Sequence, residues 1–345
     1  MEFGTPIVYG TSHEELEQIP LYDKILDLAI SADRAGVSSI WFQEHHLIAL
    51  GQSPSALMSC VQIAQHVKAR VGTAVVVLPY HLSAVQLAGQ IAQADNATGG
   101  RLELGVGRGA YGYEFEKFGI PLDQSLPRFI ETLDAIKMLY VNADKESSFD
   151  GKFVKFEDVY IWPRPKQLPY PPIWIAAQSL PAIEDAARRG YHVLHQSFIW
   201  GDDHIQSVMD AFNRGKEQGG NPDLKIAVSR YAYLAESEAD AEARIDDMMD
   251  NWRVHQQLHD FSHKSNPLGI IKPVVQEKEP DRNEVRERLL IGTEDHLVAK
   301  IEKYRDMGMD VLNLGINFGT PHERIKGSLE RLTPLIARYG SMVLA

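Results

Sequence analysis

Two short apolar stretches, Arg101-Leu-Glu-Leu-Gly-Val-Gly-Arg-Gly109 and Trp41-Phe-Gln-Glu-His-His46, decide the fold of this chain. Each has the pattern of a buried strand that ends in residues able to do chemistry. The first ends in an arginine between two glycines, and the second in a glutamate and two histidines. Strands that deliver polar groups at their C-terminal tips, with a helical stretch between them, are typical of a (β/α)8 barrel with its active site on that face. The two stretches therefore predict a barrel enzyme.

The rest of the chain alternates between strand and helix patterns. β-Branched and aromatic runs bounded by glycine or proline predict strands, and apolar residues at helical spacing predict helices. The predicted strands cover 1–8, 39–43, 71–78, 102–106, 173–177, 191–198, 225–235 and 311–315. The predicted helices cover 22–35, 55–67, 84–97, 125–141, 181–189, 203–217, 238–255, 293–307 and 321–339.

Eight strands alternating with helices are the count of a TIM barrel, so we expect one α/β domain over residues 1–345. A doubly wound open sheet is the alternative, although it would leave an unpaired edge among strands that look buried.

Two segments interrupt the alternation. Residues 142–172 form a polar excursion with five prolines and a hairpin-like Phe149-Asp-Gly-Lys-Phe153. Residues 259–289 are charged, contain prolines and show no clear periodicity. A long loop inside a compact barrel is usually functional or disordered. We therefore expect 259–289 to be a lid-like loop.

Composition excludes several classes of function. A net charge of −12 argues against binding to nucleic acid or to anionic membranes, which needs a basic face. The single cysteine, Cys60, excludes an intramolecular disulfide and a multi-cysteine zinc site. The sequence shows neither signal-peptide features at its start nor an apolar run near ~18 residues. The cytoplasm is the expected compartment.

The Glu44-His45-His46 trio falls where a barrel strand opens into its loop. A histidine there can act as an acid, a base or a hydrogen-bond donor near neutral pH. Adjacent histidines on an extended segment point to opposite sides, and no HExxH spacing is present, so no metal is expected. A strand-end salt bridge with packing explains the trio equally well.

Gly105-Val-Gly-Arg-Gly109 is no dinucleotide fingerprint, because it lacks the third spaced glycine and follows the fourth strand. Its glycines permit close approach to a ligand, and Arg108 can grip a phosphate, unless it pairs with Glu103 or Glu114. The segment 176–182 runs from a strand into a helix whose start could bind the same phosphate. Ser179 alone would be better explained as a helix cap.

Three further histidines can be placed from the sequence only approximately. His192 and His195 should face opposite sides of one strand, so that one could reach the barrel mouth, and His255 is expected at the surface or in a loop.

Taken together, these motifs resemble the bacterial-luciferase-like flavin-dependent monooxygenases, typified by alkanal monooxygenase α chains. The resemblance covers essentially the whole chain. The matching residues are Trp41 to His46, Val71-Gly-Thr-Ala-Val75, Gly99 to Tyr111 with Phe115 and Phe118-Gly119, and Ala177-Gln-Ser179 with Arg189-Gly190.

The resemblance implies a TIM barrel that binds reduced FMN, supplied by a separate flavin reductase. With O2 as co-substrate it would form a flavin C4a-(hydro)peroxide that oxidises a small organic substrate. His45 would correspond to the catalytic histidine, with Glu44 and His46 beside it. The implied cofactor-binding residues are Ala74, Val75, Arg108, Gly109, Ala110, Tyr111, Gln178, Ser179 and Leu180.

The resemblance implies three further features. Ala74-Val75 falls where the family has a non-prolyl cis peptide, and 259–289 falls where luciferase has a mobile covering loop. Family barrels pair through the helices expected at 55–67 and 84–97, which implies a homodimer or a heterodimer with a related chain. Small residues allow close approach there, either to a second chain or to the barrel: Ala84, Ala88, Gly89 and Ala92.

The sequence departs from the luciferase pattern at one position, and two other functions remain as alternatives to the monooxygenase. Gly107 stands where luciferase α chains have a reactive cysteine, which argues against light emission and long-chain aldehyde oxidation. An F420-dependent oxidoreductase of the same superfamily is one alternative. A non-catalytic flavin-binding subunit is the other.

Overall fold

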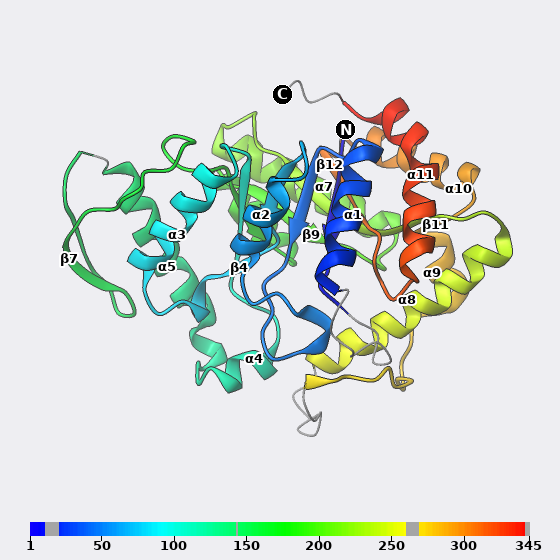
Figure 1. The fold of residues 1–345 in the computed structure, drawn as a ribbon, viewed down its shortest axis with the longest axis horizontal. Coiled ribbons are helices and arrows are strands. Elements are labelled where there is room, and N and C mark those ends of the chain that lie inside the picture. Colours follow the sequence, from blue (N-terminus) through cyan, green and yellow to red (C-terminus); the bar gives the residue numbers. More distant parts are fainter. Residues whose placement is uncertain (11–20, 143, 260–268, 342–345) are drawn as a thin grey trace.

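The computed structural model describes residues 1–10, 21–142, 144–259 and 269–341 (Figure 1). Its centre is a closed ring of parallel strands, each hydrogen-bonded to its neighbours, and β12 pairs with β1 to complete the ring. In ring order the strands are β1 (Glu2–Ile7), β2 (Ser39–Phe42), β3 (Arg70–Thr73) with β4 (Val76–Val77), β5 (Leu102–Gly107), β8 (Ile173–Ala176), β9 (His192–Gln196), β10 (Ile226–Leu234) and β12 (Val311–Gly315). The ring confirms the TIM barrel and makes the open-sheet alternative wrong.

Helices cover the outside of the ring (Figure 1). They are α1 (Leu21–Ala35), α2 (Ala56–Ala64), α3 (Ala84–Ala97), α5 (Ser125–Val141), α6 (Leu180–Arg188), α7 (Asp202–Gly219), α8 (Glu238–His259), α10 (Glu294–Asp306) and α11 (His322–Tyr339). Serines begin several of them: Ser83 Oγ, for example, accepts a hydrogen bond from Gln86 N at 3.2 Å. None of the helices in the described part of the chain is long and apolar enough to cross a membrane.

Side chains alternate along the strands between the helix layer and the barrel interior. The interior cluster contains Trp41 and Trp174, whose rings meet edge to face at 5.3 Å, with Leu194, Ala227 and Val311. Gly72 makes room for the Trp41 ring, since a Cβ there would lie 2.3 Å from it. The interior below the mouth is therefore a filled core and not a channel.

The structure corrects the expected elements in four places. The strand expected at 71–78 is divided into β3 and β4 by the cis peptide Ala74–Val75. A short helix that the sequence did not predict, α4 (Gly112–Lys117), follows β5. Within 259–289 the structure adds α9 (Arg282–Arg288), and β11 (Leu290–Gly292) follows directly, pairing with the end of β10. The expected helix 238–255 continues as α8 to His259.

The structure describes the expected insertion 142–172 almost completely, and the expected insertion 259–289 only in part. Residues 142–172 contain the expected hairpin, formed by β6 (Ser147–Asp150) and antiparallel β7 (Lys155–Val159), which projects from the barrel side (Figure 1). Of the lid-like loop, residues 260–268 lie outside the described residues, and 269–281 is an irregular segment.

Candidate active site at the carboxyl ends of the strands

The structure brings the predicted site residues to one end of the barrel. Residues 44–46 follow β2, residues 108–111 follow β5, and residues 178–180 follow β8. Strands β2, β3, β5 and β8 are successive neighbours in the ring, and all are parallel. The carboxyl ends of these strands therefore place the three segments around one side of the barrel mouth.

The carboxylate of Glu44 makes its hydrogen bonds to neighbouring residues of the barrel wall. Its buried carboxylate accepts a hydrogen bond from His46 Nε2 at 2.9 Å and from Val77 N at 3.0 Å, and His81 Nε2 lies 3.3 Å away. Burial acts to raise the pKa of Glu44, but the hydrogen bonds from His46 and His81 outweigh it and hold the pKa below its usual value. In this conformation Glu44 and His46 form the strand-end salt bridge that the sequence left open.

His45 is oriented from two sides. Its Nδ1 lies 3.2 Å from Glu114 Oε1, and its ring stacks on Tyr111 with centroids 4.8 Å apart and planes at 22°. Because the carboxylate can only accept, Nδ1 donates to it, and in the neutral form of the ring Nε2 keeps its lone pair. Within the described residues Nε2 has no hydrogen-bond partner, which leaves it available to a ligand.

Glu114 is a site residue that the sequence did not identify. It is buried, accepts from His45 Nδ1 and from His46 N at 2.6 Å, and its second oxygen accepts from Tyr80 OH at 3.1 Å. It lies on α4, which sequence periodicity missed, and it appeared only as a possible partner of Arg108. A buried carboxylate that holds an imidazole fixes the tautomer and the orientation of the ring.

Helix α8 contributes to the same site. Tyr111 is buried, which raises the pKa of its phenol, and its neutral hydroxyl forms a hydrogen bond of 2.8 Å with His255 Nδ1. Leu258, one turn further along α8, packs with Tyr111 and Ile48. The expectation that His255 belongs to the surface is therefore wrong, because a helix that looked peripheral in the sequence reaches the mouth.

Arg108 follows β5 with its side chain exposed. No hydrogen bond or ion pair to another described residue engages its guanidinium, so its suggested pairing with Glu103 or Glu114 is wrong. Glu103 instead pairs with Arg70 and accepts from Trp174 Nε1 at 2.7 Å inside the barrel. Arg108 remains available for an anion.

The segment after β8 begins helix α6. Ser179 is its N-cap, with Oγ accepting from Ala182 N at 3.4 Å, so the capping interpretation is confirmed. Gln178 and Ser179 are exposed. The start of a helix carries a partial positive charge, and here it lies on the strand next to the one that bears Arg108.

Small uncharged residues form the wall between these groups. A Cβ at Gly107 would lie 2.7 Å from Val75 Cγ2 and 3.5 Å from Ala176 Cβ, so a cysteine there would displace Val75. Ala74 and Val75 pack on the Trp41 and Trp174 cluster, joined by the cis peptide that the resemblance implied. An uncharged wall beside an unpaired arginine and a helix start fits a planar ring system that carries a phosphate.

Neither histidine of β9 reaches the mouth, contrary to expectation. His192 lies at the start of the strand, where it stacks on Trp174 at 4.6 Å. His195 faces away from the barrel interior, donates through Nδ1 to Ala177 O at 2.9 Å, and accepts from Ser197 Oγ at 2.7 Å. Burial lowers the pKa of each to about 4, so both are neutral at pH 7.

Across the described residues, no group of three or more His, Cys, Asp or Glu side chains is arranged to hold a metal ion.

Known proteins share this fold and part of this sequence. The family description "Luciferase-like monooxygenase" matches residues 1–311. The oxygenase component of a flavin-dependent trigonelline monooxygenase from Acinetobacter baylyi is 30% identical over 96% of this chain and 93% of its own length. An F420-dependent glucose-6-phosphate dehydrogenase from Kineococcus radiotolerans is 23% identical over 88% and 90%. Among solved structures, monooxygenase RslO1 from Streptomyces bottropensis superposes with a TM-score of 0.82 at 25% identity, covering 99% of this chain and 100% of that one.

Proposed function

Since this chain belongs to the luciferase-like monooxygenase family, we propose that it is the oxygenase of a two-component system that uses reduced FMN and O2. The observation that carries the proposal is His45, held by Glu114 and Tyr111 at the same barrel end as the unpaired Arg108. In the balanced reaction, one oxygen atom of O2 enters a small organic substrate, the other leaves as water, and FMNH2 becomes FMN.

Each part of the site has a role in this proposal. Reduced FMN, when bound, supplies the two electrons that activate O2. Arg108 and the start of α6, with Gln178, Ser179 and Leu180, would hold its phosphate. Ala74, Val75, Gly109, Ala110 and Tyr111 would line its ring.

The protein supplies the proton chemistry and the dry surroundings. His45 Nε2 would accept and return a proton beside the reacting oxygen, while Glu114 stabilises the imidazolium that forms. Ile48, Leu258 and Ile271, which pack around Tyr111 at the mouth, would exclude water from the site. Exclusion of water favours transfer of oxygen to the substrate over release of H2O2.

A separate flavin reductase is the proposed partner, and the name "oxygenase component" of the Acinetobacter relative supports it. We expect the reaction in the cytoplasm and place trigonelline first in a substrate panel, because the same relative acts on it. The F420-dependent relative keeps hydride transfer as the second candidate. Titrating the protein with FMN and with F420 separates the two, since an enzyme that binds only F420 and works without O2 would overturn the proposal.

The test of mechanism is His45→Ala, with the exposed His66→Ala as the matched control. We expect His45→Ala to bind FMN nearly as tightly as the wild type, yet to lose product formation about 10²-fold or more while still consuming O2. Product is measured beside O2 uptake and H2O2. Unchanged product formation would remove His45 from the mechanism and direct attention to His46.

A further inference from the structure

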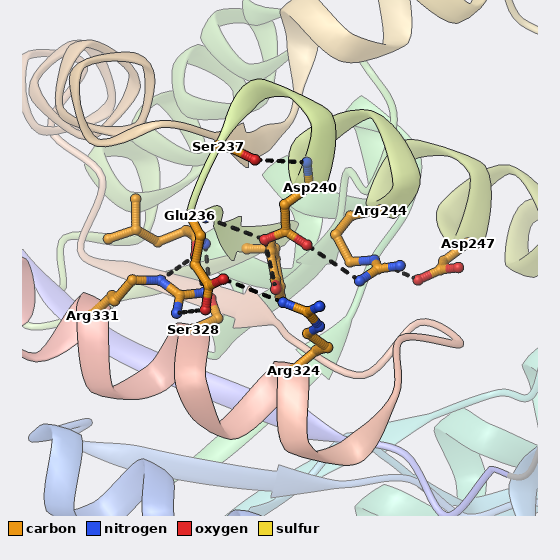
Figure 2. A network of polar contacts seen from close by, with 10 residues as sticks. Glu236, Ser237, Asp240, Arg244, Asp247, Arg324, Ser328 and Arg331 are labelled. Carbon is orange, nitrogen blue, oxygen red and sulfur yellow. Dashed lines mark hydrogen bonds and ion pairs between the residues drawn. The ribbon is translucent and has the colours of Figure 1, made fainter.

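Helix α8 is fixed at its beginning by a network of polar contacts (Figure 2). Asp240 accepts from Tyr233 OH at 3.0 Å on β10, and Arg244 joins Asp240 to Asp247 at 3.4 Å and 2.7 Å. Glu236, just before the helix, pairs with Arg331 at 2.9 Å and Arg324 at 3.3 Å on α11. The first turns of α8 are therefore tied both to the barrel and to the closing helix.

The other end of α8 runs to the site, close to α4 (Figure 1). Asn251 Nδ2 donates to Tyr231 OH at 2.6 Å, and His255 Nδ1 is hydrogen-bonded to Tyr111 OH at 2.8 Å. Asn251, His255 and Leu258 are spaced by four and three residues, so they share one face of the helix. That face contacts residues from two separate strands of the ring, Tyr231 on β10 and Tyr111 after β5, which have β8 and β9 between them.

From this arrangement we propose that His255 is a positioning residue of the proposed oxygenation, acting on His45 through Tyr111. The Tyr111 ring is the surface on which the His45 ring stacks, at 4.8 Å. The phenol O–H prefers to lie in the plane of its ring, so the hydrogen bond between the Tyr111 hydroxyl and His255 Nδ1 opposes rotation of the ring about its long axis. Glu114 fixes His45 at Nδ1, and Tyr111 fixes its tilt, so the two together determine the direction of Nε2.

Removing the imidazole at position 255 leaves the buried Tyr111 hydroxyl short of one hydrogen-bond partner, a loss that favours rotation of the phenol. His45 would keep its bond to Glu114 but lose a fixed stacking surface. Small errors in the placement of a catalytic group are costly to turnover and leave binding of a ligand elsewhere in the site almost unchanged. This inference rests on the proposed function for its kinetic consequence, but the state of the His45 ring can be measured without flavin.

The experiment compares His255→Leu, which removes the hydrogen-bonding ring, with His255→Asn, whose amide offers an oxygen or a nitrogen near the position of Nδ1. Tyr111→Phe and the double variant His255→Leu/Tyr111→Phe complete the cycle. Gln256→Leu is the control, since it changes the exposed neighbour on the same helix. Two properties are measured: the ¹⁵N signals of the His45 ring in flavin-free protein, and kcat, KM and the FMN dissociation constant.

We expect His255→Leu to broaden or shift the His45 ring signals and to lower kcat about tenfold, with FMN affinity within about twofold of the wild type. His255→Asn should restore most of both properties. The double variant should be no worse than either single variant, because both break the same contact. Gln256→Leu should match the wild type.

Unchanged His45 signals in His255→Leu, equal effects in Gln256→Leu, or losses that multiply in the double variant would each overturn the inference. If no substrate is oxygenated by the wild type, the proposed function fails, while the ring signals still decide whether His255 positions His45.

Discussion

Arg108 is the charged side chain at the mouth that has no protein partner within the described residues, and its role can be separated from that of the ring-binding wall. We expect Arg108→Ala to weaken FMN by ~1.5–3 kcal/mol, because it removes a charge-assisted fork from a phosphate. Riboflavin lacks the phosphate and should bind the variant and the wild type alike. Fluorescence titration measures both ligands.

Arg108→Lys is the matched control, since it keeps the charge without the planar fork, and it should lie between the wild type and the alanine variant. If riboflavin and FMN weaken equally in Arg108→Ala, the arginine supports the site in another way and the phosphate assignment fails.

His195 makes the stability of the protein depend on pH. Burial lowers the pKa of His195 to about 4. Between about pH 6.5 and pH 4 the imidazole is therefore protonated in the unfolded chain and neutral in the folded protein. The contribution of His195 to the free energy of unfolding is therefore fully present above about pH 6.5 and is lost as the pH falls toward about 4. Between pH 7 and pH 5 this one residue lowers the free energy of unfolding by about 2 kcal/mol.

Urea unfolding at the two pH values measures the effect. His195→Gln should show a smaller loss between pH 7 and pH 5 than the wild type, whereas His66→Gln, at an exposed position, should show the same loss as the wild type. An identical pH dependence in His195→Gln would mean that other groups cause it.

At the scale of elements, the segment 269–281 is attached to α8 by a small number of contacts. Arg253 and Glu279 form two hydrogen bonds of 2.7 Å, and Gln257 Nε2 donates to Lys272 O at 2.7 Å. Ile271 packs beside Ile48, Tyr111 and Leu258 at the mouth. We propose that residues 269–281 act as a lid over the site.

Glu279→Ala should release the segment without disturbing the barrel. We expect faster hydrogen exchange in 269–281, nearly unchanged FMN affinity, and a larger fraction of O2 released as H2O2, since a loosened cover admits water. Glu277→Ala is the control, because Glu277 is exposed nearby and has no ion pair among the described residues. Faster exchange with unchanged coupling of O2 to product would make the segment structural and not a lid.

The strand and helix pattern of the sequence was enough to predict the barrel, because its strands are buried on both faces and its long helices are periodic. The missed elements are short: α4 has six residues, α9 has seven and β11 has three. Elements of that length are stabilised by tertiary packing and carry little periodicity of their own. Missing α4 also hid Glu114, and the long charged helix α8 gave no sign that His255 points toward the barrel mouth.

At the scale of the whole molecule, the predicted pairing of two barrels needs an accessible face on α2 and α3. Ala84, Ala88 and Ala92 are buried in the chain's own core, so the close approach expected of them is within the chain. Gly89 remains, with no atom within 4 Å of a Cβ added to it, and Met58 on α2 is 74% exposed. We infer that these helices form the dimer interface through Gly89 and its exposed neighbours.

Gly89→Arg should therefore convert a dimer into a monomer while the fold is retained, because the new side chain meets open space within the chain. Light scattering measures the mass, and Glu330→Arg on the exposed face of α11 is the control. A wild-type monomer at micromolar concentration would contradict the inference, as would a dimer that survives in Gly89→Arg.

The first and last described residues meet at the end of the barrel opposite the site (Figure 1). Met1 N lies 3.0 Å from Ser341 Oγ, and Ser341 N donates to Met1 O at 2.9 Å. A peptide linker of a few residues could therefore join them, and new termini could be opened at the exposed turn Gly220–Asn221, giving a circular permutant with the same barrel. The same geometry suits attachment to an electrode through Ser341, since the protein would be held by its base with the mouth facing the solution.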